Sequence, residues 1–297
     1  MVRREESRMK KFVILGAGQF GKICALLFQT SNYQLLAFGD NNKQIQDTTF
    51  SHPLGMEIPV VSVEKAIGYE PDYVFISVMD EERTRQLLEQ VKRTGYAGEY
   101  IFLKDLYEIL DIRSATLLRI VARLQELHLC GDVAELGVYR GDTAWKINAL
   151  FPEQDLYLFD TFQGFDNRDV EKERESNLSH ASENDFSDTS EELVRRRLPH
   201  PEKAIICKGF FPETTKGLEE KVFQFVSLDA DLYAPILAGL EYFYPRLCQG
   251  GMILLHDYNN ARFQGAKQAV KDYEQKNGKL MLIPLCDLHG SAIIIHP

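Results

Sequence analysis

Two segments of the chain, 12–40 and 132–164, share one pattern of apolar and polar positions. Each begins with a short apolar run, passes through a turn that contains glycines, continues with apolar residues at helical spacing, and ends with a second apolar run followed by an aspartate. Such runs predict buried strands, and apolar positions three and four apart predict a helix. The chain is therefore expected to be an α/β protein with two doubly wound, Rossmann-like domains.

The same pattern predicts the domain boundaries. Further apolar runs at 73–78 and 100–103 complete a small first domain, residues 1–105. Residues 106–129 carry apolar side chains at helical spacing and predict one amphipathic helix that connects the domains. The second domain is expected over residues 130–297.

The turn of the first domain has the spacing Gly-x-Gly-x-x-Gly, at Gly16, Gly18 and Gly21, and Asp40 follows the second strand. In dinucleotide-binding folds these glycines form the turn, admit a phosphate and let helix and strand pack, while the acid binds a ribose. Domains that bind NAD(P), nucleotide-sugars or CoA share this spacing with domains that have lost their ligand, so both interpretations stay open. Residues 1–105 resemble the N-terminal nucleotide-binding domain of bacterial sugar O-acyltransferases and related polysaccharide enzymes.

The turn of the second domain carries a different charge. Glu135 and Asp142 flank a turn that holds only two glycines, Gly137 and Gly141. Carboxylates there repel a pyrophosphate and attract the cationic amino-acid end of S-adenosylmethionine. Asp160, after the next strand, is placed to accept hydrogen bonds from a ribose. The turn therefore favours S-adenosylmethionine, and an α/β unit without a ligand is the alternative.

Polar side chains follow two later strands of this domain. Asp229 and Asp231 follow one apolar run, and His256 and Asp257 follow the next. Open α/β sheets bind ligands at the edge where their parallel strands end. Carboxylates brought together there repel each other unless a proton or cation separates them, and these ligands suit Mg²⁺ or a similar divalent ion. Alternatively, one aspartate binds the ligand's amino group and the other caps a helix.

A polar insertion at 166–203 follows the strand that ends at Asp160. Its first half is charged and almost without aliphatic residues, so it cannot form a core of its own. It is either a solvated loop or a lid over the substrate, and its place after the ribose-binding strand favours the lid. Its candidates for contact with a polar substrate are His180, Asp185 and Asp188, for each of which a surface role is the alternative.

Charge and cysteine content exclude several classes of partner. A net charge of -10 argues against nucleic acid and against an anionic membrane surface as partners. The apolar segment 11–29 imitates a secretory signal, but glycines interrupt it, and no run is long enough to span a membrane. Five scattered cysteines are expected to be reduced, which favours a cytoplasmic protein.

Several sequence motifs of the second domain are specific enough to indicate a family. This domain resembles the macrocin O-methyltransferases, metal-dependent sugar methyltransferases of macrolide biosynthesis, and more distantly catechol O-methyltransferase. The resemblance covers most of 132–270 and is carried by AELGVYRGDTA (134–144), LFDTFQGF (158–165), KGFFPETT (208–215), SLDADLYAPILAGLEYFYPRL (227–247) and GGMILLHDYN (250–259).

The resemblance implies a class I S-adenosylmethionine methyltransferase fold and a role for each matching residue. The turn around the methionine part of the cofactor would be formed by Glu135, Gly137, Tyr139, Gly141 and Thr143. Asp160, with Thr161 beside it, would hold the ribose, and Phe162 and Phe210 would line the adenosine pocket. Asp229, next to the cofactor, and Asp257 would bind the metal. Family members usually have a second acid where this chain has His256, which leaves the third metal ligand open.

The activity implied is methyl transfer from S-adenosylmethionine to a sugar hydroxyl, assisted by Mg²⁺ or a similar ion, with Asp231 and His256 as competing candidates for the base. The acceptor would be a small sugar-containing molecule. Two alternatives stay open: an NAD(P)-dependent sugar oxidoreductase or epimerase acting through the first domain, and a non-catalytic protein that binds nucleotide-sugars. Whether the chain forms a homo-oligomer also stays open.

Overall fold

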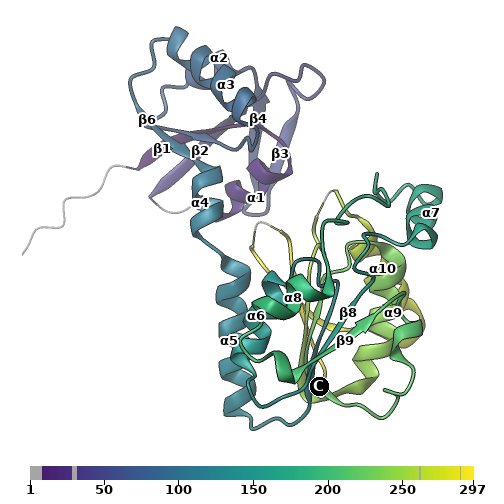
Figure 1. Cartoon of the computed structure of the whole chain (residues 1–297). Coiled ribbons are helices and arrows are strands. Elements are labelled where there is room, and N and C mark those ends of the chain that lie inside the picture. Colours follow the sequence, from purple (N-terminus) through teal and green to yellow (C-terminus); the bar gives the residue numbers. More distant parts are fainter. Residues whose placement is uncertain (1–8, 29–31, 261, 288) are drawn as a thin grey trace, which may run out of the picture. The chain divides into compact units, whose positions relative to one another are not determined.

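The computed structural model describes residues 9–28, 32–260, 262–287 and 289–297 (Figure 1). The chain divides into two compact units, Met1–Asp111 and Ile112–Pro297. The expectation of one continuous helix over 106–129 is wrong, because two helices, α4 (Leu103–Ile109) and α5 (Ile112–Glu126), meet at this boundary. Leu110 leaves the helical conformation at φ -100° and ψ 77°, so the leucines before and after it belong to separate apolar stripes.

Unit 1 is built on a six-stranded sheet with the order β3-β4-β2-β1-β5-β6. All neighbours pair in parallel except β3 and β4, so the chain winds outward from β1 in both directions. Its strands are β1 (Lys10–Leu15), β2 (Tyr33–Gly39), β3 (Thr49–His52), β4 (Met56–Val61), β5 (Tyr73–Ile76) and β6 (Glu99–Phe102), and its further helices are α1 (Gln19–Phe28), α2 (Val63–Ile67) and α3 (Glu81–Arg93).

Unit 2 is built on a seven-stranded sheet with the order β12-β13-β11-β10-β7-β8-β9. Strands β7 to β11 are parallel, and β13 and β12 add antiparallel edges. The strands are β7 (Asp132–Leu136), β8 (Leu156–Asp160), β9 (Ala204–Lys208), β10 (Phe223–Leu228), β11 (Leu247–Leu255), β12 (Met281–Pro284) and β13 (Ala292–Ile295).

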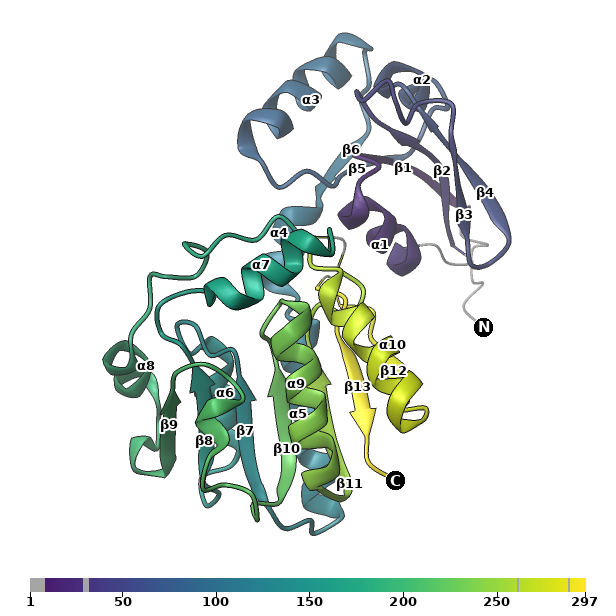
Figure 2. The ribbon, with the colours of Figure 1, turned by 90° about the vertical axis from the view of Figure 1, so that its right-hand side faces the viewer.

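Helices cover both faces of this sheet. Successive side chains of its strands point to opposite faces, and because both sets are apolar, both faces need to be covered. On one face, Val133 packs with apolar residues of α5, α6 (Asp142–Leu150) and α8 (Glu191–Arg197). On the other face, Ala134 packs with residues of α9 (Tyr233–Phe243) and α10 (Gly265–Asn277). Figure 2 shows α9 and α10 side by side over this face. The fully buried parallel strands explain the near-continuous apolar runs of the sequence.

The direction of winding in unit 2 reverses between β7 and β10, which are neighbours in the sheet. The loops after these two strands therefore leave in different directions and open a crevice at the carboxyl edge of the sheet. The turn after β7, Asp160 at the end of β8, and Asp229 after β10 all lie at this edge. The fold thus brings the predicted site residues of unit 2 to one place.

The insertion 166–203 is structured. It forms α7 (Asn167–Glu175), α8 and the short 3-10 helix η1 (Pro201–Lys203). Val170 of α7 is fully buried in a small cluster with Ala181, Leu232 and Phe263. The alternative of a solvated loop is therefore wrong: too polar to form its own core, the insertion packs on residues of the main domain.

The described part of the chain has no helix with the length and apolar composition that a bilayer span requires. All five cysteines are unpaired.

Candidate active site

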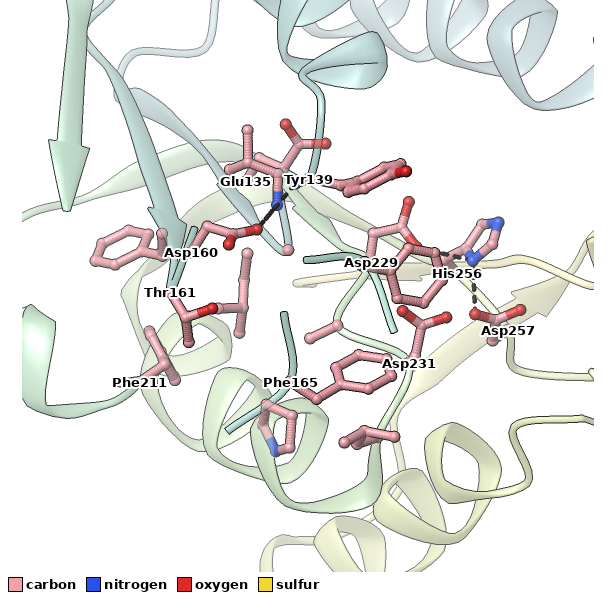
Figure 3. Close-up of a pocket in the computed structure, with 18 of the residues that line it drawn as sticks. Glu135, Tyr139, Asp160, Thr161, Phe165, Phe211, Asp229, Asp231, His256 and Asp257 are labelled. Carbon is pink, nitrogen blue, oxygen red and sulfur yellow. Dashed lines mark hydrogen bonds and ion pairs between the residues drawn. The ribbon is translucent and has the colours of Figure 1, made fainter. Parts of the chain in front are cut away.

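A cavity of about 580 Å³ opens at the carboxyl edge of the unit 2 sheet. It is lined by the turn after β7, by the ends of β8, β10 and β11, and by residues of the insertion. Figure 3 shows Glu135 and Asp160 toward one side of it and the group of Asp229, Asp231, His256 and Asp257 toward the other. The two clusters of acids that the sequence singles out therefore face one cavity.

Gly137 and Asp160 determine the shape of the turn after β7. At Gly137, φ is 86°, and a Cβ atom would lie 2.1 Å from the carbonyl oxygen of Asp229, so only glycine allows this approach. The Asp160 carboxylate accepts hydrogen bonds from the backbone N–H groups of Val138 (2.7 Å) and Tyr139 (2.9 Å), and from that of Phe162 (2.6 Å). Because a carboxylate has about four acceptor positions, Asp160 retains capacity for a ligand hydroxyl.

Glu135 is buried in β7 at 1% exposure, and its Oε2 atom has no hydrogen-bond partner among the described residues. Burial, followed by the negative charge of Asp229, raises the pKa of Glu135 well above its ordinary value, while Arg113 opposes the shift. A buried carboxylate with an unpartnered oxygen costs free energy unless a proton or a cation compensates it. The site is thus suited to a positively charged group beside Glu135.

Asp229, Asp231, His256 and Asp257 each place a ligand atom within 4.8 Å of the others. The Nδ1 atom of His256 lies 2.8 Å from Oδ1 of Asp229 and 2.8 Å from Oδ2 of Asp257, as the dashed lines in Figure 3 show. Asn260 donates to the second oxygen of Asp257. Oxygen and imidazole donors at this spacing fit a divalent ion.

The charges of this cluster need compensation. Burial and the neighbouring carboxylates of Asp257 and Asp229 raise the pKa of Asp231 well above its ordinary value. Burial lowers the pKa of His256, but Asp229 and Asp257 outweigh burial and raise it to about 10. Burial alone would raise the pKa of Asp229, but His256 and Arg113 hold it below its ordinary value. The positive charges of His256 and Arg113 therefore compensate the carboxylates of the cluster.

Arg113 is a residue of this site that the sequence pattern did not indicate. It lies in the first turn of α5, and its Nη1 atom is 2.9 Å from Oδ2 of Asp229. Its Nη2 atom donates to the hydroxyl of Thr143, in the first turn of α6. Burial lowers the pKa of Arg113, but Asp229 and Glu135 outweigh this and raise it.

Asp169 of α7 is a second residue that the sequence pattern did not indicate. It lines the cavity, is 7% exposed, and its Oδ1 atom has no partner among the described residues. Burial, with the nearby charge of Asp166, raises the pKa of Asp169 to about 6. The insertion therefore contributes a buried carboxyl to the cavity.

The three residues of the insertion that the sequence proposed for substrate contact do not line this cavity. His180 is exposed, Asp185 pairs with Arg262 at 3.5 Å, and Asp188 accepts a hydrogen bond of 2.6 Å from the Tyr139 hydroxyl. The last bond ties the insertion to the turn after β7, and Thr189 adds a bond to the carbonyl of Tyr139. Tyr139 thus has a role in holding the insertion as well as in lining the cavity.

The two phenylalanines predicted to line an adenosine pocket, Phe210 and Phe162, lie in different surroundings. Phe210 lines the cavity, and the Arg168 guanidinium lies 3.5 Å from the centre of its ring. The expectation that Phe162 lines an adenosine pocket is wrong, because its ring is 5% exposed and packs in the core with Val138 and Val194. The backbone of Phe162 has φ 55°, so the side-chain alternation of β8 does not continue past Asp160.

The remaining predicted residues of unit 2 are close by. Thr161 lines the cavity and donates to the carbonyl of Gly164 at 2.5 Å. Gly141, with φ 81°, precedes α6, and a Cβ atom there would lie 3.1 Å from the side chain of Val194. Gly141 therefore shapes the turn rather than lining the cavity.

The glycine turn of unit 1 has the geometry that its spacing predicts. A Cβ atom at Gly21 would lie 2.2 Å from the carbonyl oxygen of Gly16, whereas one at Gly18 would meet nothing within 4 Å. Asp40 accepts hydrogen bonds of 2.8 Å from the backbone N–H groups of Ala17 and Asn42. Packing thus requires Gly16 and Gly21 but not Gly18, and a nucleotide ligand in unit 1 stays a prediction.

Unit 1 also contains a Tyr-x-x-x-Lys spacing, the pattern of many nicotinamide-dependent oxidoreductases, at Tyr100 and Lys104. Tyr100 lies in β6 with its ring 5.5 Å from that of Tyr96, and Lys104 lies in α4, 3.5 Å from Glu81. Because a strand and a helix carry these two residues, they do not share one helix face. The spacing gives no support to the oxidoreductase alternative.

The fold of unit 2, with its crevice between β7 and β10, is that of the class I S-adenosylmethionine methyltransferases. The structure resembles the O-methyltransferase NovP with a TM-score of 0.54 and 23% identity over 62% of this chain and 79% of that one. It also resembles the calicheamicin methyltransferase CalS11, with a TM-score of 0.50 and 18% identity over 73% of this chain and 87% of that one.

The family model of the macrocin O-methyltransferases matches residues 109–293, which is more than half of the chain. The chain belongs to this family. Among curated proteins, it is 26% identical over 160 residues to a mycinamicin III 3''-O-methyltransferase of Micromonospora griseorubida, covering 50% of this chain and 62% of that relative. It is 25% identical over 175 residues to a rhamnosyl-tetracenomycin 4'-O-methyltransferase of Streptomyces olivaceus, covering 55% of this chain and 64% of that relative. The match thus spans less than two thirds of each relative.

Proposed function

We propose that the chain transfers the methyl group of S-adenosylmethionine to a hydroxyl of a small sugar-containing molecule, and that a divalent ion such as Mg²⁺ assists the transfer. One observation carries the proposal: the buried, unpartnered Glu135 carboxyl and the cluster of Asp229, Asp231, His256 and Asp257 face the same cavity. A sulfonium cofactor and a cation that orients a hydroxyl need such an arrangement.

The residues of the turn hold the cofactor. Glu135 pairs with the ammonium group of its methionine part, which compensates the buried carboxylate. Asp160 accepts a hydrogen bond from the ribose while its bonds to Val138 and Tyr139 keep the turn in shape. Phe210, with Arg168 on its ring, offers an aromatic surface to the adenine.

Asp229 and Asp257 hold the divalent ion, with His256 as the third protein ligand. When bound, the ion lowers the pKa of the sugar hydroxyl and fixes its direction toward the methyl group. Asp231 and His256 both line the cavity, and Asp231 is the better candidate for the base that takes the hydroxyl proton. Its carboxyl has a raised pKa, whereas Nδ1 of His256 is engaged by two carboxylates. The acceptor class follows the relative from Streptomyces olivaceus, whose name describes methyl transfer to a rhamnosyl-tetracenomycin.

The test is methyl transfer by the full chain from S-adenosylmethionine to a panel of nucleotide-activated sugars and glycosylated small molecules. Formation of S-adenosylhomocysteine and a mass gain of one CH₂ on a sugar would support the proposal. The transfer should stop in Asp231→Asn and Asp257→Asn and after chelation of divalent ions. Transfer that persists undiminished in EDTA would remove the ion from the mechanism, and failure of the chain to bind S-adenosylhomocysteine would overturn the proposal.

A further inference from the structure

The methionine part of S-adenosylmethionine is a zwitterion, so its site must satisfy two opposite charges. The proposed function assigns the ammonium group to Glu135. The carboxylate on the same carbon atom then lies within a few ångströms of Glu135 and needs a cationic donor of its own, because an unpaired buried charge is strongly unfavourable.

Five cationic or imidazole side chains line the cavity: Arg113, Arg140, Arg262, His256 and His289. The Arg140 side chain is 48% exposed and lies 3.7 Å from Asp188, and that of Arg262 is 66% exposed and pairs with Asp185. His256 is held between Asp229 and Asp257. None of these three is both buried and close to the turn after β7. The ring centre of His289 lies 5.0 Å from that of His256, and burial together with the charges of His256 and Arg113 lowers the pKa of His289, so it carries little positive charge near neutral pH.

Arg113 meets both conditions. Its side chain is only 18% exposed, and it contacts Thr143 of α6 and Asp229 across the crevice. Glu135 lines the same cavity, and the charges of Arg113 and Glu135 each act on the pKa of the other. The first turn of α6, where Thr143 lies, also favours an anion through the helix dipole.

We propose that Arg113 binds the α-carboxylate of the methionine part of the cofactor, and that this contact distinguishes the intact cofactor from its decarboxylated form. This inference rests on the proposed function. A planar guanidinium with five N–H donors matches a carboxylate in two-pronged geometry, which lysine cannot reproduce. When an ion binds Asp229, the α-carboxylate of the cofactor also serves as a second anionic partner for Arg113. The zwitterion is then held between Glu135 and Arg113, which fixes the direction of the sulfonium methyl group.

The test compares two ligands that differ only in the carboxylate. S-adenosylhomocysteine and decarboxylated S-adenosylhomocysteine are titrated calorimetrically into the full chain with Mg²⁺ present. We expect the wild-type chain to bind the intact ligand on the order of 30- to 100-fold more tightly, and Arg113→Gln to bind both ligands within about threefold of each other, since the loss of one buried ion pair accounts for such a ratio. Arg113→Lys should retain a small part of the preference.

Arg140→Gln is the matched control, because Arg140 also lines the cavity but is exposed and paired with Asp188. It should keep the wild-type preference. The same preference in Arg113→Gln as in the wild type would overturn the inference and leave the proposed function standing, as would equal affinity of the wild-type chain for the two ligands. The latter comparison needs no variant, so it decides the question even if Arg113→Gln does not fold. Binding of neither ligand by the wild-type chain would overturn both proposals.

Discussion

The Nδ1 atom of His256 lies 2.8 Å from Oδ1 of Asp229, although the two residues follow different strands of the sheet. The contact joins the ends of β10 and β11, with Asp257 on the other side of the same nitrogen. An imidazolium here compensates the two carboxylates, and a divalent ion bound by the same oxygens would replace that compensation. Under the proposed function, a histidine in place of an acid at this position would set how strongly the cluster attracts a metal.

Replacing His256 by an acid should strengthen metal binding. His256→Asp removes a positive charge and adds an oxygen ligand, and we expect the affinity for Mg²⁺ to rise by about tenfold or more, because hard oxygen ligands suit this ion. Isothermal titration with Mg²⁺ on both chains measures the change. Weaker binding by the aspartate variant would contradict this prediction and show that the imidazole binds the ion better than a carboxylate does.

Glu135→Gln should change stability and cofactor binding in opposite directions. The glutamine removes a buried carboxyl whose pKa is raised. The free energy of unfolding of the free chain should therefore rise by roughly 1–2 kcal/mol near neutral pH, and its melting temperature should rise with it. Affinity for S-adenosylhomocysteine should fall about 10- to 100-fold, because the ammonium group loses its partner. A variant that is both less stable and unchanged in affinity would refute the assignment of Glu135.

Asp160→Ala should weaken cofactor binding, and Asp40→Ala in unit 1 is the matched control. The substitution removes the acceptor of three backbone N–H groups and of the ribose, so stability should drop by about 1–3 kcal/mol and affinity for S-adenosylhomocysteine by on the order of 10- to 100-fold. Asp40→Ala removes a similar acceptor of backbone N–H groups from unit 1. It should cost stability without any change in that affinity, as thermal unfolding and calorimetry on both variants would show.

Asp169→Asn should reveal a pH dependence. Burial raises the pKa of Asp169 from 3.8 to about 6 in the folded chain. The folded state therefore holds this proton more tightly, and the stability that the carboxyl contributes is present below about pH 4 and is lost as the pH rises through 6. The melting temperature of Asp169→Asn relative to the wild type should increase from about pH 5 to about pH 7.5. A difference in melting temperature that does not vary with pH would show that the Asp169 carboxyl is exposed to water.

The nucleotide prediction for unit 1 depends on Gly18, the glycine of the turn that packing does not require. Gly18→Trp should leave the fold intact and abolish any thermal stabilisation by NADH or by UDP-sugars, because the ring covers the backbone that a phosphate would approach. Melting curves with each ligand give the answer. Stabilisation that survives the substitution would place the ligand elsewhere.

The sequence predicts the parallel strands near the centre of each unit and the edge of the sheet that carries the site, but not the antiparallel strands β3, β12 and β13. Carboxyl ends of parallel strands meet at one edge, so Asp160, Asp229 and Asp257 could be placed together from the order of the strands alone. Arg113 could not, because it is 116 residues from Asp229 and its helix pattern gives no sign of a contact across the crevice. Asp169 lies in a charged run of the sequence, and its side chain is buried only because α7 packs on Leu232 and Phe263. The resemblance placed the ring of Phe162 in the adenosine pocket, but Phe162 has a left-handed backbone and its ring packs in the core.

The central claim is that the turn after β7 and the cluster around Asp229 form one site for a sulfonium cofactor. Calorimetric titration of the full chain with S-adenosylhomocysteine, in the wild type and in Glu135→Gln, tests it most directly. We expect one binding event per chain, with a Kd in the micromolar range or tighter and a marked loss of affinity in the variant. No binding by the wild type, or equal binding by both chains, would contradict it.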